Sequence, residues 1–286
     1  MRHMPFDPFA LIFSRLLHNR ISVHHSKEMS ELILIRSGLR GLIASKIESI
    51  TGQTAIMQAA AIIGVTEEIA TYEMHRADRA KASCVYPNAI KASSVKLLPD
   101  RRDRETVNVA FICGTFSEWH GLERLFSAVR EYPDNSIEDK LRIYLIGNLF
   151  GHQRQAIIQN ARLKSIFQPL GHMPEAAYRP ILERCDLGLT SFALDLKDLR
   201  EAATLKVREM LAMGLPVYAG HKDTALSNDF PYYVNDRIIN VDSLLSFAKR
   251  MKAVSRDTVR SSAEPFIDKV KAMDHVAAFC RQHFNI

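Results

Sequence analysis

The chain has 286 residues, of which 47% are hydrophobic and 24% are charged, and its formal net charge is +6. This is the composition of an ordinary globular protein with room for two domains. No apolar run reaches the roughly 20 residues that a transmembrane helix needs, and the stretch after Met1 does not have the pattern of a secretory signal peptide.

The four cysteines are far apart in the sequence and form no C-x-x-C pair: Cys84, Cys113, Cys185 and Cys280. Cys113 and Cys185 lie in apolar runs and are expected to be buried free thiols, which fits a reducing cytosol. No cluster of histidines and cysteines has the spacing of metal ligands, so no metal site is expected.

The positive charge is uneven, since about +5 of the +6 lies in residues 1–104. A basic N-terminal region suits an anionic membrane surface or a phosphorylated acceptor, and it is equally compatible with solubility alone. Basic and aromatic residues do not interleave, so no nucleic acid partner is expected. We therefore expect a cytoplasmic protein, which the basic region would hold peripherally at the inner face of a membrane.

The first hundred residues alternate between strand and helix patterns, which predicts half of a doubly wound α/β domain. The expected elements are a short helix at Phe9–Leu17, a strand at Ile21–His25, a long amphipathic helix from Lys27 to about Ile50 ended by Gly52, a strand at Ala59–Val65, a helix starting at Thr66, and a strand ending at Val85–Asn88.

Lys91–Glu105 is polar, has no strong periodicity, and is expected to be the interdomain linker. A second α/β series follows, which implies a parallel sheet with right-handed crossovers and a ligand site beyond the carboxyl ends of its strands. Strands are expected at Val107–Cys113, Leu141–Ile146, Ile166–Leu170, Asp186–Thr190 and Ile238–Val241, and helices at Leu122–Glu131, Gln153–Leu163, Pro174–Arg184, Ser243–Met251 and Ile267–Phe284.

The stretch Leu199–Gly220 is predicted to fold as loop, helix, turn and strand. Thr204 is placed to cap a helix that begins at Leu205, and Gly214 is placed to end it in a left-handed conformation before Pro216. The strand is expected to start at Val217-Tyr218-Ala219.

Two carboxylates, Glu201 and Glu209, lie on either side of this helix start, eight positions apart. The free backbone N–H groups near Thr204, Leu205 and Lys206 would attract the phosphates of a ligand. Its hydroxyl-bearing rings would then lie near the two carboxylates, which describes a nucleotide-sugar.

Glu-x7-Glu followed by an Ala-x-Gly-x-Pro-Val run resembles the donor site of retaining glycosyltransferases of the GT-B fold, family 4 type. The sequence LKVREMLAMGLPV is similar to the variant LK-x-x-E-x-L-A-x-G-x-P-V. The resemblance implies two Rossmann-like, doubly wound α/β domains with the donor cleft between them. It implies that Glu209 binds the ribose hydroxyls and that Glu201 contacts the transferred sugar in a catalytic role.

The loop GTFSEWHG resembles the family loop Gly-Arg-x-x-x-x-Lys-Gly, whose basic residues hold the donor diphosphate. Gly114 and Gly121 match its glycines, whereas Thr115 and His120 stand at its basic positions. All four are expected to contact the diphosphate, with Lys206 supplying the missing positive charge.

Two further segments resemble parts of the family's cleft. Gly171-His172-Met173-Pro174 resembles F-x-G-x-V/M-P, which implies that Gly171 and Met173 belong to the base pocket. His25 resembles the histidine that faces the donor sugar from the N-terminal domain, and its neighbour His24 competes for that catalytic assignment.

The resemblance divides the chain into residues 1–98, 99–262 and a C-terminal helix at 263–286 that packs back on the first domain. The first domain is expected to be incomplete, because no glycine precedes Gly38 and the family's early glycine-rich loop is missing. The implied function is transfer of a hexose from a UDP- or GDP-sugar, with retention and without a cofactor, to a saccharide or lipid-linked acceptor in polysaccharide or glycolipid synthesis. The alternatives are an inactive nucleotide-sugar-binding subunit that needs a partner chain and a sugar-nucleotide epimerase.

Overall fold

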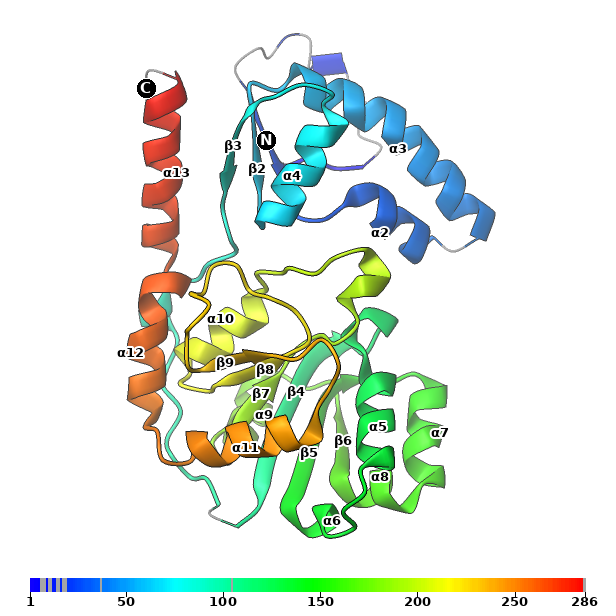
Figure 1. Cartoon of the computed structure of the whole chain (residues 1–286), viewed down its shortest axis with the longest axis vertical. Coiled ribbons are helices and arrows are strands. Elements are labelled where there is room, and N and C mark those ends of the chain that lie inside the picture. The colour runs from blue at the N-terminus through cyan, green and yellow to red at the C-terminus, as the bar shows by residue number, and fades with distance from the viewer. Residues whose placement is uncertain are drawn as a thin grey trace.

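A computed structural model of the chain describes residues 1–5, 9, 12–13, 16, 20–36, 38–103 and 105–284. Two parallel β-sheets, each covered by helices, are joined by the segment between Val85 and Val107 (Figure 1). The predicted α/β class is confirmed. The helix expected at Phe9–Leu17 lies mostly outside the described residues. No helix of the described part of the chain is long and apolar enough to cross a membrane.

The first sheet has three parallel strands in the order β1 (Ile21–His24), β2 (Ala61–Gly64) and β3 (Ala82–Val85). Successive side chains of β2 point to opposite faces. On one face, Ile62 packs with residues of the α3–α4 layer (Gly38–Gln58 and Glu67–Arg76). On the other face, Ala61 and Ile63 pack against Phe279 of the C-terminal helix α13 (Lys269–Phe284).

The single helix predicted from Lys27 to about Ile50 is wrong. The segment forms α2 (Glu28–Ile35) and α3, because Gly38 adopts a left-handed φ of +65° that interrupts the helical path. Gly52 does not end α3 either. It lies inside the helix, where a side chain would collide with the carboxylate of Glu48.

The second sheet has six parallel strands in the order β6-β5-β4-β7-β8-β9. This is the order of a doubly wound dinucleotide-binding fold, and it reverses between β4 and β7. The strands are β4 (Val107–Thr115), β5 (Leu141–Asn148), β6 (Phe167–Gly171), β7 (Leu187–Leu189), β8 (Val217–Ala219) and β9 (Tyr233–Asn235).

Helices cover both faces of this sheet, and each face has its own apolar core. The first layer consists of α5 (Leu122–Glu131), α6 (Ile137–Lys140), α7 (Gly151–Gln159), α8 (Ala161–Ile166) and α11 (Val241–Met251). The second consists of α9 (Glu175–Leu182), α10 (Leu205–Ala212) and α12 (Arg256–Ile267).

Two expectations for this half are corrected. The strand expected at Ile238–Val241 is wrong, because Asn240 caps α11 and the side chain of Ile238 is 87% exposed. The helix expected at Gln153–Leu163 is two helices, since Asn160 takes an extended conformation and caps α8. The sequence analysis also missed α12.

Candidate functional site

The start of α10 lies where the sequence analysis placed it. The hydroxyl of Thr204 accepts a hydrogen bond from the Val207 N–H at 3.4 Å, so the predicted N-cap is confirmed. Gly214 has the predicted left-handed conformation, with a φ of +78°. Within the described residues, the Leu205 and Lys206 N–H groups of the first turn have no hydrogen-bond partner, and they lie at the end that carries the positive helix dipole.

A cation and a carboxylate accompany these N–H groups. The ammonium of Lys206 lies 3.2 Å from Glu209 Oε2, and both side chains are about two-fifths exposed. Burial raises the pKa of the Cys113 thiol to about 12, and the nearby Lys206 charge opposes that shift. Val207 of α10 and Ile112 of β4 belong to the same apolar core, so the start of α10 packs near the end of β4, which is one of the two strands at the reversal of the sheet order.

The loop after β4 is fixed to the segment after β7. The backbone carbonyls of Trp119 and His120 accept hydrogen bonds from the Ala193 and Phe192 N–H groups at 3.3 and 3.0 Å. Gly121 has a φ of +71°, and a side chain there would lie 2.9 Å from Phe192 Cβ. Glycine is therefore required at this point for the loop to approach the neighbouring strand end.

His120 is a neutral group in this loop. Its ring is half-buried, contacts Phe111 and Phe116 edge-on, and hydrogen-bonds the Ser117 carbonyl at 3.2 Å. Burial lowers the pKa of His120. At neutral pH the ring therefore carries no positive charge, and because its N–H is used in the bond to Ser117, the free Nε2 can only accept a hydrogen bond. Thr115 is exposed at the end of β4.

A cavity of about 370 Å³ lies beyond the ends of β5 and β6. Its walls are mostly apolar, with one cation, and comprise Gly147, Leu149, Arg154, Ile157, Ile158, Pro169, Leu170 and Gly171. Gly171 has a φ of +75°. Met173, which the sequence analysis grouped with Gly171, packs against the core between α9 and α10.

Glu201 contacts the first domain. Its Oε2 accepts a hydrogen bond from the Glu68 N–H at 3.0 Å, in the first turn of α4. In return, Glu68 Oε2 accepts from the N–H groups of Arg200 and Glu201 at 2.8 and 3.0 Å. Each domain thus contributes one carboxylate, Glu68 or Glu201, that accepts hydrogen bonds from backbone N–H groups of the other domain.

Further interdomain contacts surround this exchange. The ammonium of Lys27 lies 3.0 Å from Glu68 Oε1 and 3.1 Å from Asp198 Oδ2. Asn88 donates from its side chain to the Ala203 carbonyl at 2.8 Å. No sequence motif pointed to Lys27, Glu68 or Asp198 as interdomain contacts, because only the folded chain brings these distant residues together.

A buried ion pair holds α10 in place. Arg208 has no exposed side-chain surface, makes a bidentate contact with Asp223, and donates from Nε to the Asn88 carbonyl at 2.9 Å. One signal in the sequence could have indicated the burial of Arg208, namely its place among the apolar residues of α10. The pair connects α10 to the segment that joins the two sheets.

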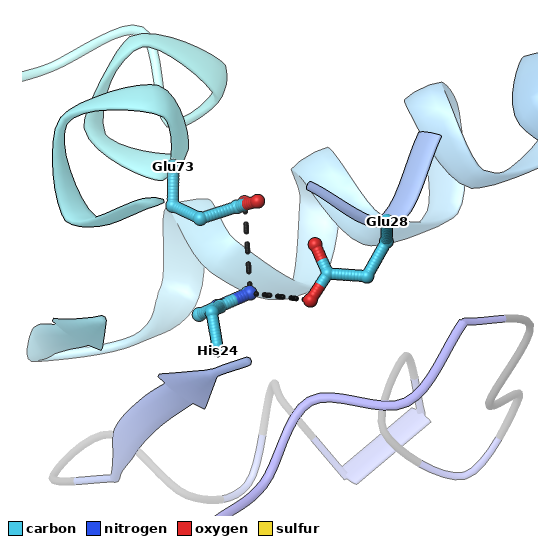
Figure 2. A group of neighbouring side chains, drawn as sticks. All are labelled: His24, Glu28 and Glu73. Atoms are coloured by element: carbon cyan, nitrogen blue, oxygen red, sulfur yellow. Dashed lines mark hydrogen bonds and ion pairs between the residues drawn. The ribbon is translucent and has the colours of Figure 1, made fainter. Parts of the chain in front are cut away.

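The two adjacent histidines of the first domain have different environments. His25 is half-buried, and burial followed by the charge of Arg2 lowers its pKa. His24 is fully buried, and its Nδ1 lies 3.1 Å from Glu28 Oε1 and 3.7 Å from Glu73 Oε2 (Figure 2). His25 is therefore the one of the two with surface available to a ligand.

The His24 group also has the composition of a metal site, with ligand atoms that lie within 4.8 Å of one another. Arg76, however, already lies 3.0 Å from Glu73 and 3.5 Å from Glu28. Its guanidinium supplies the positive charge that compensates Glu28, and it donates hydrogen bonds to Glu73. The group is therefore a buried ion-pair network.

No protein-family model and no curated protein sequence matches the chain. Solved structures do match over most of its length. The chain is similar to the apo form of the lipopolysaccharide outer core galactosyltransferase WaaB, with a TM-score of 0.61 at 12% identity, covering 94% of this chain and 78% of that one.

Two further structures match with a TM-score of 0.63. HepE of Anabaena in complex with UDP is 15% identical over 95% of this chain and 81% of its own. Sucrose-phosphate synthase from Thermosynechococcus elongatus is 12% identical over 92% of this chain and 68% of its own. The chain therefore has the fold of the GT-B glycosyltransferases, with two Rossmann-like domains.

Proposed function

We propose that the chain transfers a hexose from a nucleoside-diphosphate sugar with retention of configuration, as a GT-B enzyme of the family 4 type. The observation that carries this proposal is the start of α10. Its unpaired N–H groups, Lys206 and Glu209 lie together near the end of β4, at the reversal of the strand order. A parallel doubly wound sheet binds its ligand at such a place.

Each part of the donor has a matching group in this arrangement. The diphosphate would accept from the N–H groups near Leu205, with Lys206 as the cation and Thr115 as a further donor. Glu209 would accept hydrogen bonds from the ribose hydroxyls. The cavity beside Gly171 is large enough to take the base of UDP or GDP.

The transferred sugar would lie between Glu201 and His25. The carboxylate of Glu201 already binds the Glu68 N–H, but a carboxylate has about four lone-pair sites and can also accept from a sugar hydroxyl. The neutral imidazole of His25 can exchange a hydrogen bond with another hydroxyl. In this proposal both residues hold the sugar across the domain interface.

Catalysis would depend on the leaving diphosphate. Donors that are fixed in place before the reaction stabilise charge that develops in the transition state, and they need not reorganise. The start of α10, Lys206 and the Gly114 loop supply such donors. The leaving phosphate would then accept the proton of the incoming acceptor hydroxyl on the same face of the sugar, which retains the configuration.

The acceptor is proposed to be a saccharide or a lipid-linked saccharide, in polysaccharide or glycolipid synthesis. A cytoplasmic location fits this role, since nucleotide-sugars are the expected donors. The electrostatic basis for contact with an anionic surface is the net charge of about +5 in residues 1–104, out of +6 for the whole chain.

Proton NMR of the sugar released from UDP- and GDP-hexoses tests the proposal. We expect the chain to release the sugar in the anomeric configuration of the donor, and we expect Glu201→Gln to slow this reaction while UDP still binds. An inverted product would contradict retention. Saturable UDP binding without any turnover would favour an inactive binding subunit.

A further inference from the structure

The side-chain pattern of helix α3 is the reverse of that of an ordinary surface helix, which buries its large apolar residues. Its buried positions are small or charged, namely Gly41, Ala44, Glu48, Gly52 and Ala55, with Ile56 at the end. Its large apolar side chains are exposed instead, together with two from α2. These residues, here called the α2–α3 face, are Ile33, Ile35, Leu39, Leu42, Ile43, Ile47 and Ile50, with exposed fractions between 42% and 72%.

The inner side of α3 explains why the helix keeps this orientation. A side chain at Gly41 would lie 2.9 Å from the Ile33 carbonyl oxygen, so glycine permits close packing of α3 on α2. Glu48 Oε1 lies 2.9 Å from Arg76 Nη2 and 2.8 Å from His3 Nε2. Turning the apolar side inward would break this buried charge network, which is costly.

The charges beside the α2–α3 face are positive. Arg36, Arg40 and Lys46 are exposed. Among the described acids of the two helices, Glu28 and Glu48 are buried, and Glu31 pairs with Lys197 at 2.8 Å. The described residues that line a groove of about 620 Å³ on this face include both arginines together with Ile43 and Ile47.

We propose that the α2–α3 face docks on an anionic lipid bilayer. Apolar side chains on a helix that lies in the membrane plane reach the acyl boundary, while flanking cations meet the lipid phosphates. Within α3 the exposed large apolar side chains run from Leu39 to Ile50, which is about 17 Å of helix. If a second copy of the chain bound through the same face, its cations would lie opposite those of the first copy. Like charges across an interface are unfavourable.

The position of this face is compatible with docking. Helices α3 and α13 cover opposite faces of the first sheet, and Figure 1 shows α3 on the outside of the first domain. The residues of the face on α3, from Leu39 to Ile50, do not line the pocket beside the Gly114 loop, whereas Ile35 of α2 lines it together with Ser117 and Trp119. The inference rests on the exposed apolar side chains and their neighbouring cations, and it does not depend on the proposed transfer reaction.

Co-sedimentation with lipid vesicles tests the proposal. We expect the full chain to bind vesicles containing about one third phosphatidylglycerol roughly tenfold or more tightly than pure phosphatidylcholine vesicles. Leu39→Ser/Ile43→Ser/Ile50→Ser removes exposed apolar surface and should weaken binding by about tenfold or more. Arg40→Glu/Lys46→Glu should also weaken it, by about fivefold per reversed charge or more.

Matched controls lie on the second domain. Ile238→Ser removes a side chain that is 87% exposed, and Lys164→Glu reverses an exposed charge on α8. Both should bind vesicles like the unmodified chain, and circular dichroism should show all variants folded. Failure of the unmodified chain to bind anionic vesicles, or equal binding by the serine variant, would overturn the proposal. A dimer in sedimentation equilibrium that the serine variant abolishes would assign the face to a second copy instead.

Discussion

Arg208 and Asp223 form an ion pair without any exposed side-chain surface, directly beneath the candidate donor site. Both charges are removed from water, so each depends on the other for compensation. The pair holds α10 against the segment near Asn88, whose carbonyl accepts from Arg208 Nε at 2.9 Å. Loss of one partner therefore affects stability and the position of the donor-binding helix together.

We expect Arg208→Met to lower the free energy of unfolding by about 3–5 kcal/mol, because Asp223 is left buried without a partner. Urea denaturation measures this change. The double variant Arg208→Met/Asp223→Leu should recover much of the loss. Lys140→Met is the control, since its pair with Asp134 is about half exposed and should contribute less than about 1 kcal/mol. Equal losses for the two single variants would contradict this account.

Glu73 gives the buried network of the first domain a pH dependence. Burial, and then the charge of Glu28, raise the pKa of Glu73 from 4.5 to about 10. The folded state therefore binds more protons than the unfolded state between these values, and the stability due to this group falls as pH rises through that window. The charge of Arg76 opposes the shift.

We expect Glu73→Gln to flatten the fall in stability with rising pH, because the amide remains neutral. The difference between the two chains should grow by up to about 1.4 kcal/mol per pH unit. Urea denaturation at about pH 6 and about pH 9 measures this difference, in which groups that titrate in the same way in both chains cancel. Parallel pH profiles for the two chains would show that Glu73 is ionised in the fold.

At the scale of elements, local signals predicted α10 well and the α2–α3 region poorly. Thr204 and Gly214 mark the ends of α10 through cap chemistry, which depends only on neighbouring residues. The apolar residues between Leu39 and Ile50 have helical spacing, but they face outward. The spacing of apolar residues identifies the element as a helix. It does not show which side of the helix is buried when a buried charge network determines the orientation.

Close packing of α2 on α3 depends on one glycine. We expect Gly41→Ala to lower the free energy of unfolding by about 1–3 kcal/mol, because its Cβ would crowd the Ile33 backbone and force a shift. Gly151→Ala is the control, since nothing lies within 4 Å of a Cβ at this first position of α7. Thermal or urea unfolding measures both changes. A neutral Gly41→Ala would mean that the helices separate without cost.

At the scale of the whole molecule, the two domains meet through the segment between β7 and α10. Val65 and Ile69 of the first domain pack against Leu194 and Leu199 of the second. The sequence predicted two α/β units and the ends of strands that face a ligand. It could not predict that Glu201 would bind the start of α4, because that contact joins residues 133 positions apart.

The exchange of Glu68 and Glu201 between the domains should control their separation. We expect Glu68→Ala to increase the radius of gyration in small-angle X-ray scattering, because two hydrogen bonds from the second domain and the contact with Lys27 are lost from this interface. The backbone bond from Glu68 to Glu201 remains possible in the variant. Glu175→Ala, which removes an exposed contact with Arg179, is the matched control. An unchanged scattering profile would assign domain contact to the apolar cluster alone.

Calorimetric titration of the chain with UDP and GDP tests the central claim most directly. The account predicts saturable binding of one of these nucleotides, and Glu209→Ala should weaken it by about tenfold or more, because hydrogen bonds to an ionised carboxylate are lost. Glu264→Ala, at an exposed position of α12, should bind like the unmodified chain. No binding of either nucleotide by the folded chain, or equal binding by Glu209→Ala, would contradict a nucleotide-sugar site at the start of α10.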